Sequence, residues 1–155
     1  MSIKSQTFTY DFFIALSVFL IVVFFIISFF EIRIEKYSEY WKFKSMEEFL
    51  IDASNVWFTE GDPIYWSLEN INQLGLSNSG EINSTKVDLI NNISYSKFLY
   101  LIKAYNLNVK YEVYENDKLV FDYPKLEVKG KNVVFLERYA IWNKSIVKVR
   151  TIVWD

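Results

Sequence analysis

The side chains that could do chemistry in this chain are mostly carboxylates, because its 155 residues include no Cys and no His. This composition excludes disulfides, thiolate nucleophiles, zinc sites built from Cys or His, and the usual imidazole base. Neighbouring carboxylates occur at Glu47 and Glu48, and again at Glu112 and Glu115, but such pairs are common on solvated helices and strands. The sequence has no glycine-rich phosphate loop, nucleophile elbow or metal-ligand spacing. We therefore expect no enzymatic activity, no cofactor and no metal.

The charge balance argues against a nucleic-acid partner. The chain has 17 basic and 19 acidic residues, for a net charge of −2, and no block of Lys and Arg interrupts this balance. Proteins that bind the phosphate backbone concentrate positive charge on one surface. DNA and RNA are therefore not expected as partners.

Residues 12–30, FFIALSVFLIVVFFIISFF, contain no charge, Gly or Pro. As a helix at about 1.5 Å per residue they extend about 29 Å, close to the roughly 30 Å hydrocarbon layer of a bilayer. A helix also satisfies its own backbone hydrogen bonds in lipid. We predict a single-pass transmembrane helix, the alternative being a helix buried in a soluble core. The run ends in Phe29 and Phe30 rather than in the small residues of a signal-peptidase site, so cleavage behind it is not expected.

The flanking charges give an orientation. Lys4 and the amino terminus lie on one side of the span, and the mixed set Glu31, Arg33, Glu35 and Lys36 lies on the other. By the positive-inside rule, we place residues 1–11 in the cytoplasm as a leader and the long C-terminal part outside the cell.

Residues 31–58 are predicted to continue the helix. No Gly or Pro occurs before Gly61, and apolar residues recur near the helical period. Ser45 to Glu48 have the S-x-x-E form of a capping box, which favours a kink or a fresh helix start there. The cluster at residues 59–63, TEGDP, ends the helix.

Residues 59–155 are predicted to form an α+β head. An irregular connection with a short turn at residues 67–74 leads to one helix capped by Ser84 or Thr85 and a second opened by Ser94. The apolar period then changes to two, which predicts strands at residues 109–114, 119–123, 133–142 and 146–154. The expected fold is a long hydrophobic helix packed on an antiparallel β-meander of about four strands, with short helices between.

Two smaller predictions concern the head. Glu137 and Arg138 alternate along a strand, so they point to opposite faces and form no mutual salt bridge. Aromatic residues make up 19% of the chain, and we expect the Trp residues 57, 66, 142 and 154 to fill the core between helix and sheet rather than to form a sugar-stacking surface.

The leader KSQTFTYDF at residues 4–12, polar and short with an acid at the start of a long apolar helix, resembles the class III signal peptide of archaeal type IV pilin-like proteins. Three further fragments resemble the same family: GDPIYW at 61–66, INQLGL at 71–76, and a closing hairpin with ERY at 137–139 that ends in Val153-Trp154. The resemblance spans most of the chain through short motifs.

The resemblance implies a function and a processing step. A prepilin peptidase would cut after Ser5 or Gln6, and processed subunits would pack their helices into an extracellular filament, a pilus, or a pseudopilus-like membrane complex. A cut after Gln6 leaves Asp11 at the fifth position usual in the family, whereas a cut after Ser5 leaves it sixth. Asp11 would then neutralise the new amino terminus of a neighbouring subunit, which could be another copy or a related pilin-like chain.

Alternatives stay open at several of these residues. Asp11 is equally consistent with a solvated carboxylate near a helix N-terminus, where the dipole favours it. Ala15 and Ser17 are candidates for close helix packing. Asn83, Asn92 and Asn143 fit the N-x-[ST] glycosylation pattern of an outward-facing domain, although Asn143 also suits a hairpin turn. The competing function is an uncleaved, membrane-anchored binding or accessory domain exposed outside the cell.

Overall fold

The computed structural model describes the backbone of residues 3–155 and the side chains of residues 10–155 other than 32 and 35. The chain divides into two compact units, Met1–Lys42 and Phe43–Asp155. The second unit, called the head below, thus begins inside the segment 31–58 that was expected to continue the membrane helix.

Helix α1 (Ile3–Asn55) runs through both units without interruption. The expected kink or fresh start at Ser45 does not occur, because the helix remains regular there. Met46, Leu50 and Ala53, spaced at four and three residues, are buried in the core of the head, so packing fixes one face of the last turns of α1. The helix ends at Asn55, three residues before the predicted boundary, and a turn follows at residues 56–58.

Within the described residues, the head contains a six-stranded sheet in the order β1-β2-β5-β6-β3-β4. Its long strands are β3 (Asn108–Glu115), β4 (Lys118–Tyr123), β5 (Val133–Trp142) and β6 (Ser145–Trp154). The short strands β1 (Ser77–Asn78) and β2 (Glu81–Ile82) fall in the connection predicted to be irregular. All pairings are antiparallel except β2 with β5, which is parallel. The predicted α+β class and antiparallel sheet are confirmed.

The order of the long strands differs from the expected meander. The two hairpins, β3-β4 and β5-β6, are present, but β6 rather than β5 pairs with the first hairpin, through β3. Strands β3 and β6 bury most of their alternating side chains, whereas β4 and β5 are largely exposed. The observed order places β3 and β6, the two strands with the most buried side chains, next to each other, which a meander would not do.

Both hairpins close through two-residue turns, and the second begins at Asn143, which was expected to suit a hairpin turn. Asn116 and Asp117 connect β3 to β4 with φ of 49° and 60°, and Asn143 and Lys144 connect β5 to β6 with φ of 50° and 66°. Turns with positive φ at both central residues match the twist of the strands and favour Asn and Asp.

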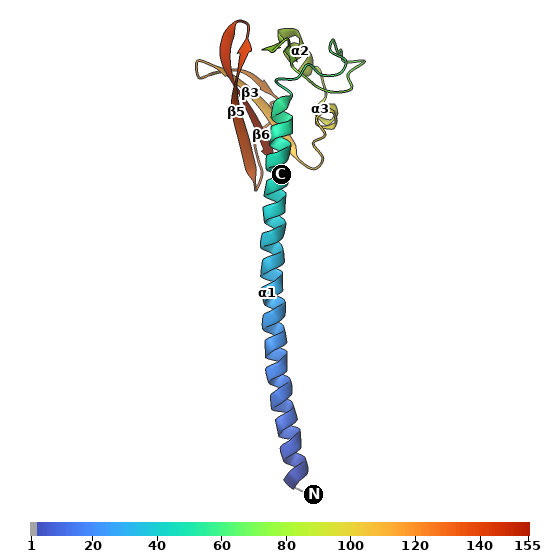
Figure 1. Ribbon diagram of the computed structural model, residues 1–155, viewed down its shortest axis with the longest axis vertical. Coiled ribbons are helices and arrows are strands. Elements are labelled where there is room, and N and C mark those ends of the chain that lie inside the picture. The colour runs from blue at the N-terminus through green and yellow to red at the C-terminus, as the bar shows by residue number, and fades with distance from the viewer. Residues whose placement is uncertain (1–2) are drawn as a thin grey trace. The chain divides into compact units, whose positions relative to one another are not determined.

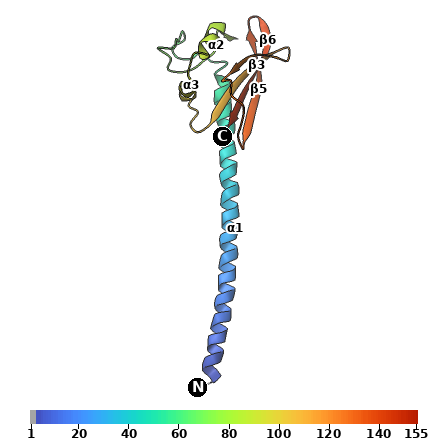
Figure 2. The ribbon, with the colours of Figure 1, turned by 180° about the vertical axis from the view of Figure 1, so that it is seen from behind.

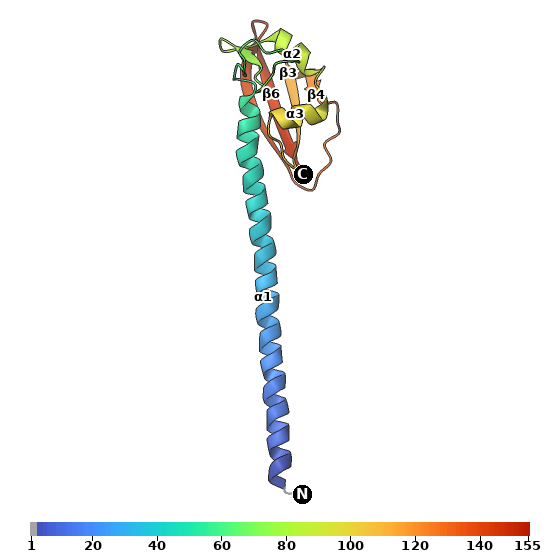
Figure 3. The same ribbon diagram turned by 90° about the vertical axis from the view of Figure 1, so that its right-hand side faces the viewer.

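Two short helices complete the head. Helix α2 (Ser84–Ile90) is capped by Asn83, one residue before the predicted cap, and α3 (Tyr95–Leu101) is capped by Ser94 as predicted. In Figure 1 and its reverse view in Figure 2, the long strands lie on one side of the last turns of α1, and α2 and α3 lie on the other. Figure 3 shows α3 in front of the sheet.

Of the four Trp residues predicted to fill the core, Trp57, Trp66 and Trp154 are buried, whereas Trp142 is only partly buried. Trp57 and Tyr111 are fully buried with ring centroids 5.2 Å apart, and Phe98 of α3 contacts Tyr111 and Tyr123 edge to face. The Tyr111 hydroxyl donates a hydrogen bond of 2.7 Å to the Ala53 carbonyl near the end of α1. This bond ties the last turn of α1 to the centre of the sheet.

Candidate functional sites on the apolar helix and the sheet

The apolar stretch of α1 exposes its side chains around the helix. Phe13, Phe24 and Phe25 are 57%, 66% and 67% exposed, and the other large apolar residues of 12–30 are exposed or half-buried. Each such side chain left in water forgoes about 1.5–3 kcal/mol of burial. The helix is long and apolar enough to cross a membrane, and the alternative of a helix buried in the chain's own core is not observed.

Asp11 directly precedes this stretch and its side chain is exposed. It lies in the third turn of α1, and the first turn contains no acidic residue. Stabilisation by the helix dipole is confined to the first turn. In the unprocessed chain the dipole therefore does not stabilise the Asp11 carboxylate, although the side chain is solvated as that interpretation expects. Removal of five or six residues would make Asp11 the sixth or fifth residue, in the second turn of the shortened helix.

Ala15 and Ser17 are both exposed on α1. The Ser17 hydroxyl donates to the Phe13 carbonyl at 2.8 Å, so it is satisfied within the helix and can enter lipid without an unpaired polar group. Two helical positions differ by about 200°, so these two small residues lie on different sides of the helix, and each would permit close packing on its own side. Ser28, eleven residues after Ser17 and about 20° away from it, shares its side of the helix and was missed.

The candidate cleavage site at Ser5 and Gln6 lies in the helical backbone of α1. The side chains of both residues lie outside the described part of the chain, so the cleavage prediction rests on the sequence alone.

The three candidate glycosylation sites differ in their surroundings. Asn83 is half-buried and its Oδ1 accepts from the Lys86 amide as the cap of α2. Asn92 is exposed after α2, and Asn143 is exposed in the β5-β6 turn, where its Oδ1 accepts from the Ser84 hydroxyl at 2.7 Å. Asn83 and Asn143 thus have structural roles, and Asn92 and Asn143 are the accessible candidates.

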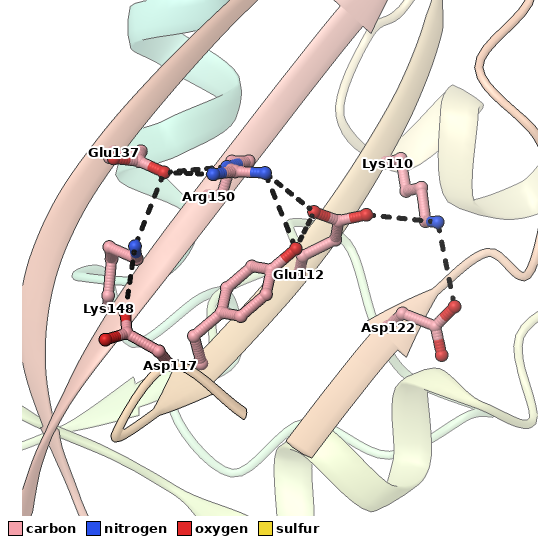
Figure 4. A network of polar contacts seen from close by, with 8 residues as sticks. Lys110, Glu112, Asp117, Asp122, Glu137, Lys148 and Arg150 are labelled. Carbon is pink, nitrogen blue, oxygen red and sulfur yellow. Dashed lines mark hydrogen bonds and ion pairs between the residues drawn. The ribbon is translucent and has the colours of Figure 1, made fainter. Parts of the chain in front are cut away.

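The face of the sheet opposite the helices, called the open face below, carries charges of alternating sign that cross all four long strands (Figure 4). Arg150 Nε donates to Glu137 Oε1 at 2.7 Å, and its Nη1 lies 3.6 Å from Glu112 Oε2. Lys110 Nζ lies 3.1 Å from Glu112 Oε1 and 3.7 Å from Asp122 Oδ2. Each carboxylate is therefore next to a cation on an adjacent strand.

A second branch of this network includes Lys148, whose Nζ lies 3.7 Å from Asp117 Oδ1 and 3.8 Å from Glu137 Oε1. The Tyr114 hydroxyl donates to Glu112 Oε2 at 2.7 Å. Burial, together with this bond to a carboxylate, raises the pKa of Tyr114, and the hydrogen bond from Arg150 lowers the pKa of Glu137. The network thus holds Glu137 in its charged, paired form, which suits a structural role.

The sequence could not reveal this network, because register brings its members together. Glu137 and Glu112 are both directly opposite Arg150 on the neighbouring strands, although the three are far apart in the chain. The prediction for Glu137 and Arg138 is confirmed: Glu137 lies on the open face. Arg138 points to the helix side, donating to Asn55 Oδ1 at 2.9 Å and lying 3.9 Å over the Phe58 ring.

Lys86 is the most unusual polar residue of the head. It is 5% exposed, and its Nζ donates to the carbonyls of Glu60 and Ser77 at 2.6 and 2.9 Å. Burial lowers its pKa. These two bonds fix the connection between α1 and α2 to the first turn of α2. This structural role of Lys86 was not predicted from the sequence.

Among the described residues, no group of three or more Asp and Glu is placed to hold a metal ion. A hollow of about 490 Å³ lies beside the last turns of α1, with Phe49, Asp52, Leu101 and Lys103 in its lining. Comparisons with known protein families, curated proteins and solved structures found no match to this chain.

Proposed function

We propose that this chain is a structural subunit of an archaeal type IV pilus-like filament or a pseudopilus-like membrane complex. The observation that carries the proposal is the apolar stretch of α1, residues 12–30, exposed around the helix and headed by Asp11. A helix of this kind followed by an antiparallel head supports a protein whose helix is held in lipid or among other helices while the head is displayed.

Assembly proceeds through the N-terminal helix. In lipid or in a filament the helix gains contacts by packing against other apolar helices, and the partners are further copies of this chain or related pilin-like subunits. A free amine buried among such helices is costly unless an opposite charge lies beside it. Asp11 supplies that charge for the amino terminus that a prepilin peptidase exposes after Ser5 or Gln6.

The proposed location is the cell membrane, with a single pass, residues 1–11 in the cytoplasm and the head outside the cell. The flanking charges support this orientation, and the exposed Asn92 and Asn143 are the glycosylation candidates of an outward-facing head.

Reversing the charge of Asp11 tests the assembly mechanism. We expect Asp11→Lys to abolish the multimers captured by chemical cross-linking in native membranes, because two positive charges then meet in the helix bundle. Asp11→Glu, which keeps the charge, should assemble normally, and Glu31→Lys at the other end of the span is the matched control. Equal cross-linking of the Asp11→Lys and wild-type proteins would show that Asp11 has no such role.

The intact mass of the protein purified from its native membrane tests processing. Loss of five or six N-terminal residues supports the pilin-like subunit, whereas a full-length mass supports the second candidate function.

That second candidate is an uncleaved single-pass anchor carrying a binding or accessory domain. The observation that favours it is the open face of the sheet, where Phe135, Tyr139 and Ile146 are 62%, 72% and 74% exposed around the charged network. Exposed aromatic and aliphatic side chains with a polar surround are typical of protein contact surfaces. A full-length mass together with a monomeric state in membranes would favour this function.

A further inference from the structure

Directly after the apolar stretch, one side of α1 combines cationic and aromatic side chains. Arg33, Ile34, Lys36, Tyr37 and Tyr40 line a shallow hollow of about 460 Å³ on the helix surface. Tyr37 and Tyr40 are 64% and 60% exposed. The transmembrane prediction used Arg33 and Lys36 only as flanking charges and gave the two tyrosines no role in the membrane.

Around the helix these residues gather near Arg33 and away from Glu31, while Glu39, three residues after Lys36, lies at the edge of the group, about 120° from Arg33. At about 100° per residue, Lys36, Tyr37 and Tyr40 fall within about 60° of Arg33. Glu31 lies about 160° away, on the opposite side of the helix. The segment is therefore nearly neutral in composition, but it presents a positive and aromatic side.

The side chains on this side point back toward the apolar stretch. Helical side chains tilt toward the helix N-terminus, and the Arg33 guanidinium lies 5.1 Å from the centre of the Phe29 ring, one turn earlier. Trp41 likewise packs on Tyr37, with ring centroids 5.8 Å apart. Long cationic side chains with this direction keep an apolar stem in lipid while the charge reaches the interface.

The distances match the thickness of a headgroup layer. With Phe30 at the edge of the hydrocarbon, Arg33 lies about 4.5 Å and Tyr37 about 10.5 Å further along the helix axis. The headgroup region is roughly 5–8 Å thick on each side of the bilayer. The backward tilt of the side chains therefore brings Arg33, Lys36 and the Tyr37 hydroxyl to the depth of the lipid phosphates.

We propose that Arg33, Lys36 and Tyr37 form a binding site for the phosphate headgroup of an anionic phospholipid, in the leaflet from which the head emerges. The inference rests on the proposed membrane anchoring of α1. The Arg33 guanidinium suits bidentate binding of a phosphate, Lys36 adds a second positive charge, and the Tyr37 hydroxyl donates a hydrogen bond while its ring lies in the interface. Such a site fixes the depth and rotation of the helix in the bilayer.

The test uses the full chain in mild detergent, titrated with phosphatidylglycerol or phosphatidylcholine, with the bound lipid counted by native mass spectrometry. We expect preferential retention of phosphatidylglycerol. Arg33→Gln and Lys36→Gln should each weaken its binding roughly fivefold, for about 1 kcal/mol per interfacial cation. Lys42→Gln, about 180° from Arg33 on the helix, is the matched control and should leave binding unchanged. Soluble glycerol phosphate should not displace the lipid, because it lacks the acyl chains that hold the headgroup at this depth.

Each outcome has a defined meaning. Equal retention of the two lipids, or equal losses for Arg33→Gln and Lys42→Gln, overturns the site while leaving the membrane anchor intact. Displacement by glycerol phosphate shows a general phosphate site and overturns the lipid assignment. A chain that stays dissolved without detergent and does not enter vesicles overturns the anchor and the site together. Circular dichroism of each variant, with unchanged helix content, confirms that the substitutions act locally.

Discussion

The hydrogen bond between Tyr111 and the last turn of α1 offers a stability prediction that the structure makes quantitative. Tyr111 is fully buried, and its hydroxyl donates to the Ala53 carbonyl at 2.7 Å. Tyr111→Phe keeps the ring and its edge contacts with Trp57 and Phe98. The substitution therefore removes one hydrogen bond and little else.

The expected cost is about 1–2 kcal/mol of unfolding free energy. A hydrogen bond of this kind contributes a net stabilisation of about 0.5–1.5 kcal/mol, and leaving a buried carbonyl unpaired adds to the loss. Ala53 retains only a long bond of 3.4 Å from the Val56 amide, so its carbonyl is poorly compensated. Tyr139→Phe is the matched control, because Tyr139 is 72% exposed and its substitution should change stability by less than about 0.5 kcal/mol.

The difference in unfolding free energy between wild type and Tyr111→Phe depends on pH. Burial raises the pKa of Tyr111 well above its usual value of 10.0, so the folded state keeps the phenol protonated where the unfolded state loses the proton. The stabilisation is therefore complete below about pH 10 and is lost as the pH rises further. At pH 11 the loss is about 1.4 kcal/mol, so wild type and Tyr111→Phe should become nearly equal in stability. Lys86, whose pKa is lowered by burial, has the opposite sign but is common to both proteins.

Urea unfolding of the full chain at fixed detergent concentration, followed by near-ultraviolet circular dichroism between pH 7 and 11, measures this difference. A difference that stays constant across this range would refute the assigned role of the Tyr111 hydroxyl. If Tyr139→Phe lost as much unfolding free energy as Tyr111→Phe, the effect would not come from burial of the Tyr111 hydroxyl.

Two further predictions concern the head. Glu137→Gln removes the negative charge that faces Arg150. Because the contact with Arg150 lowers the pKa of Glu137, the ionised carboxylate stabilises the fold above about pH 4.5, and this stabilisation is lost in acid. The urea midpoint of the variant should therefore vary less between pH 3 and 6 than that of the wild type. A steeper acid dependence in the variant would contradict this. Gly75→Ala should cost about 3 kcal/mol, because a Cβ there would lie 2.6 Å from the Thr59 carbonyl oxygen. Gly80→Ala, with open space around it and φ of +87°, should cost only about 1–2 kcal/mol; equal melting shifts would disprove the steric argument.

Local signals predicted several features of the head correctly. The period of two placed the long strands, Ser94 marked the start of α3, and Asn143 suited the turn between β5 and β6. Each of these depends on the conformational preferences of a few adjacent residues, which the sequence carries directly.

Other features needed the folded chain. The S-x-x-E pattern at Ser45 indicated a fresh helix start, but α1 continues through it and buries Met46 and Leu50 in the core. The central position of β3 and β6, the network around Arg150, and the hydrogen bonds of the buried Lys86 join residues far apart in the sequence. Pairing register and burial decide such contacts, and neither is encoded in any short segment.

The sequence by itself determined the character of residues 12–30, because an uncharged run of this length has few favourable environments other than lipid or other helices. The tertiary structure decided which side chains of the head are buried, paired or exposed, because the free energy of each depends on neighbours that folding brings from distant positions.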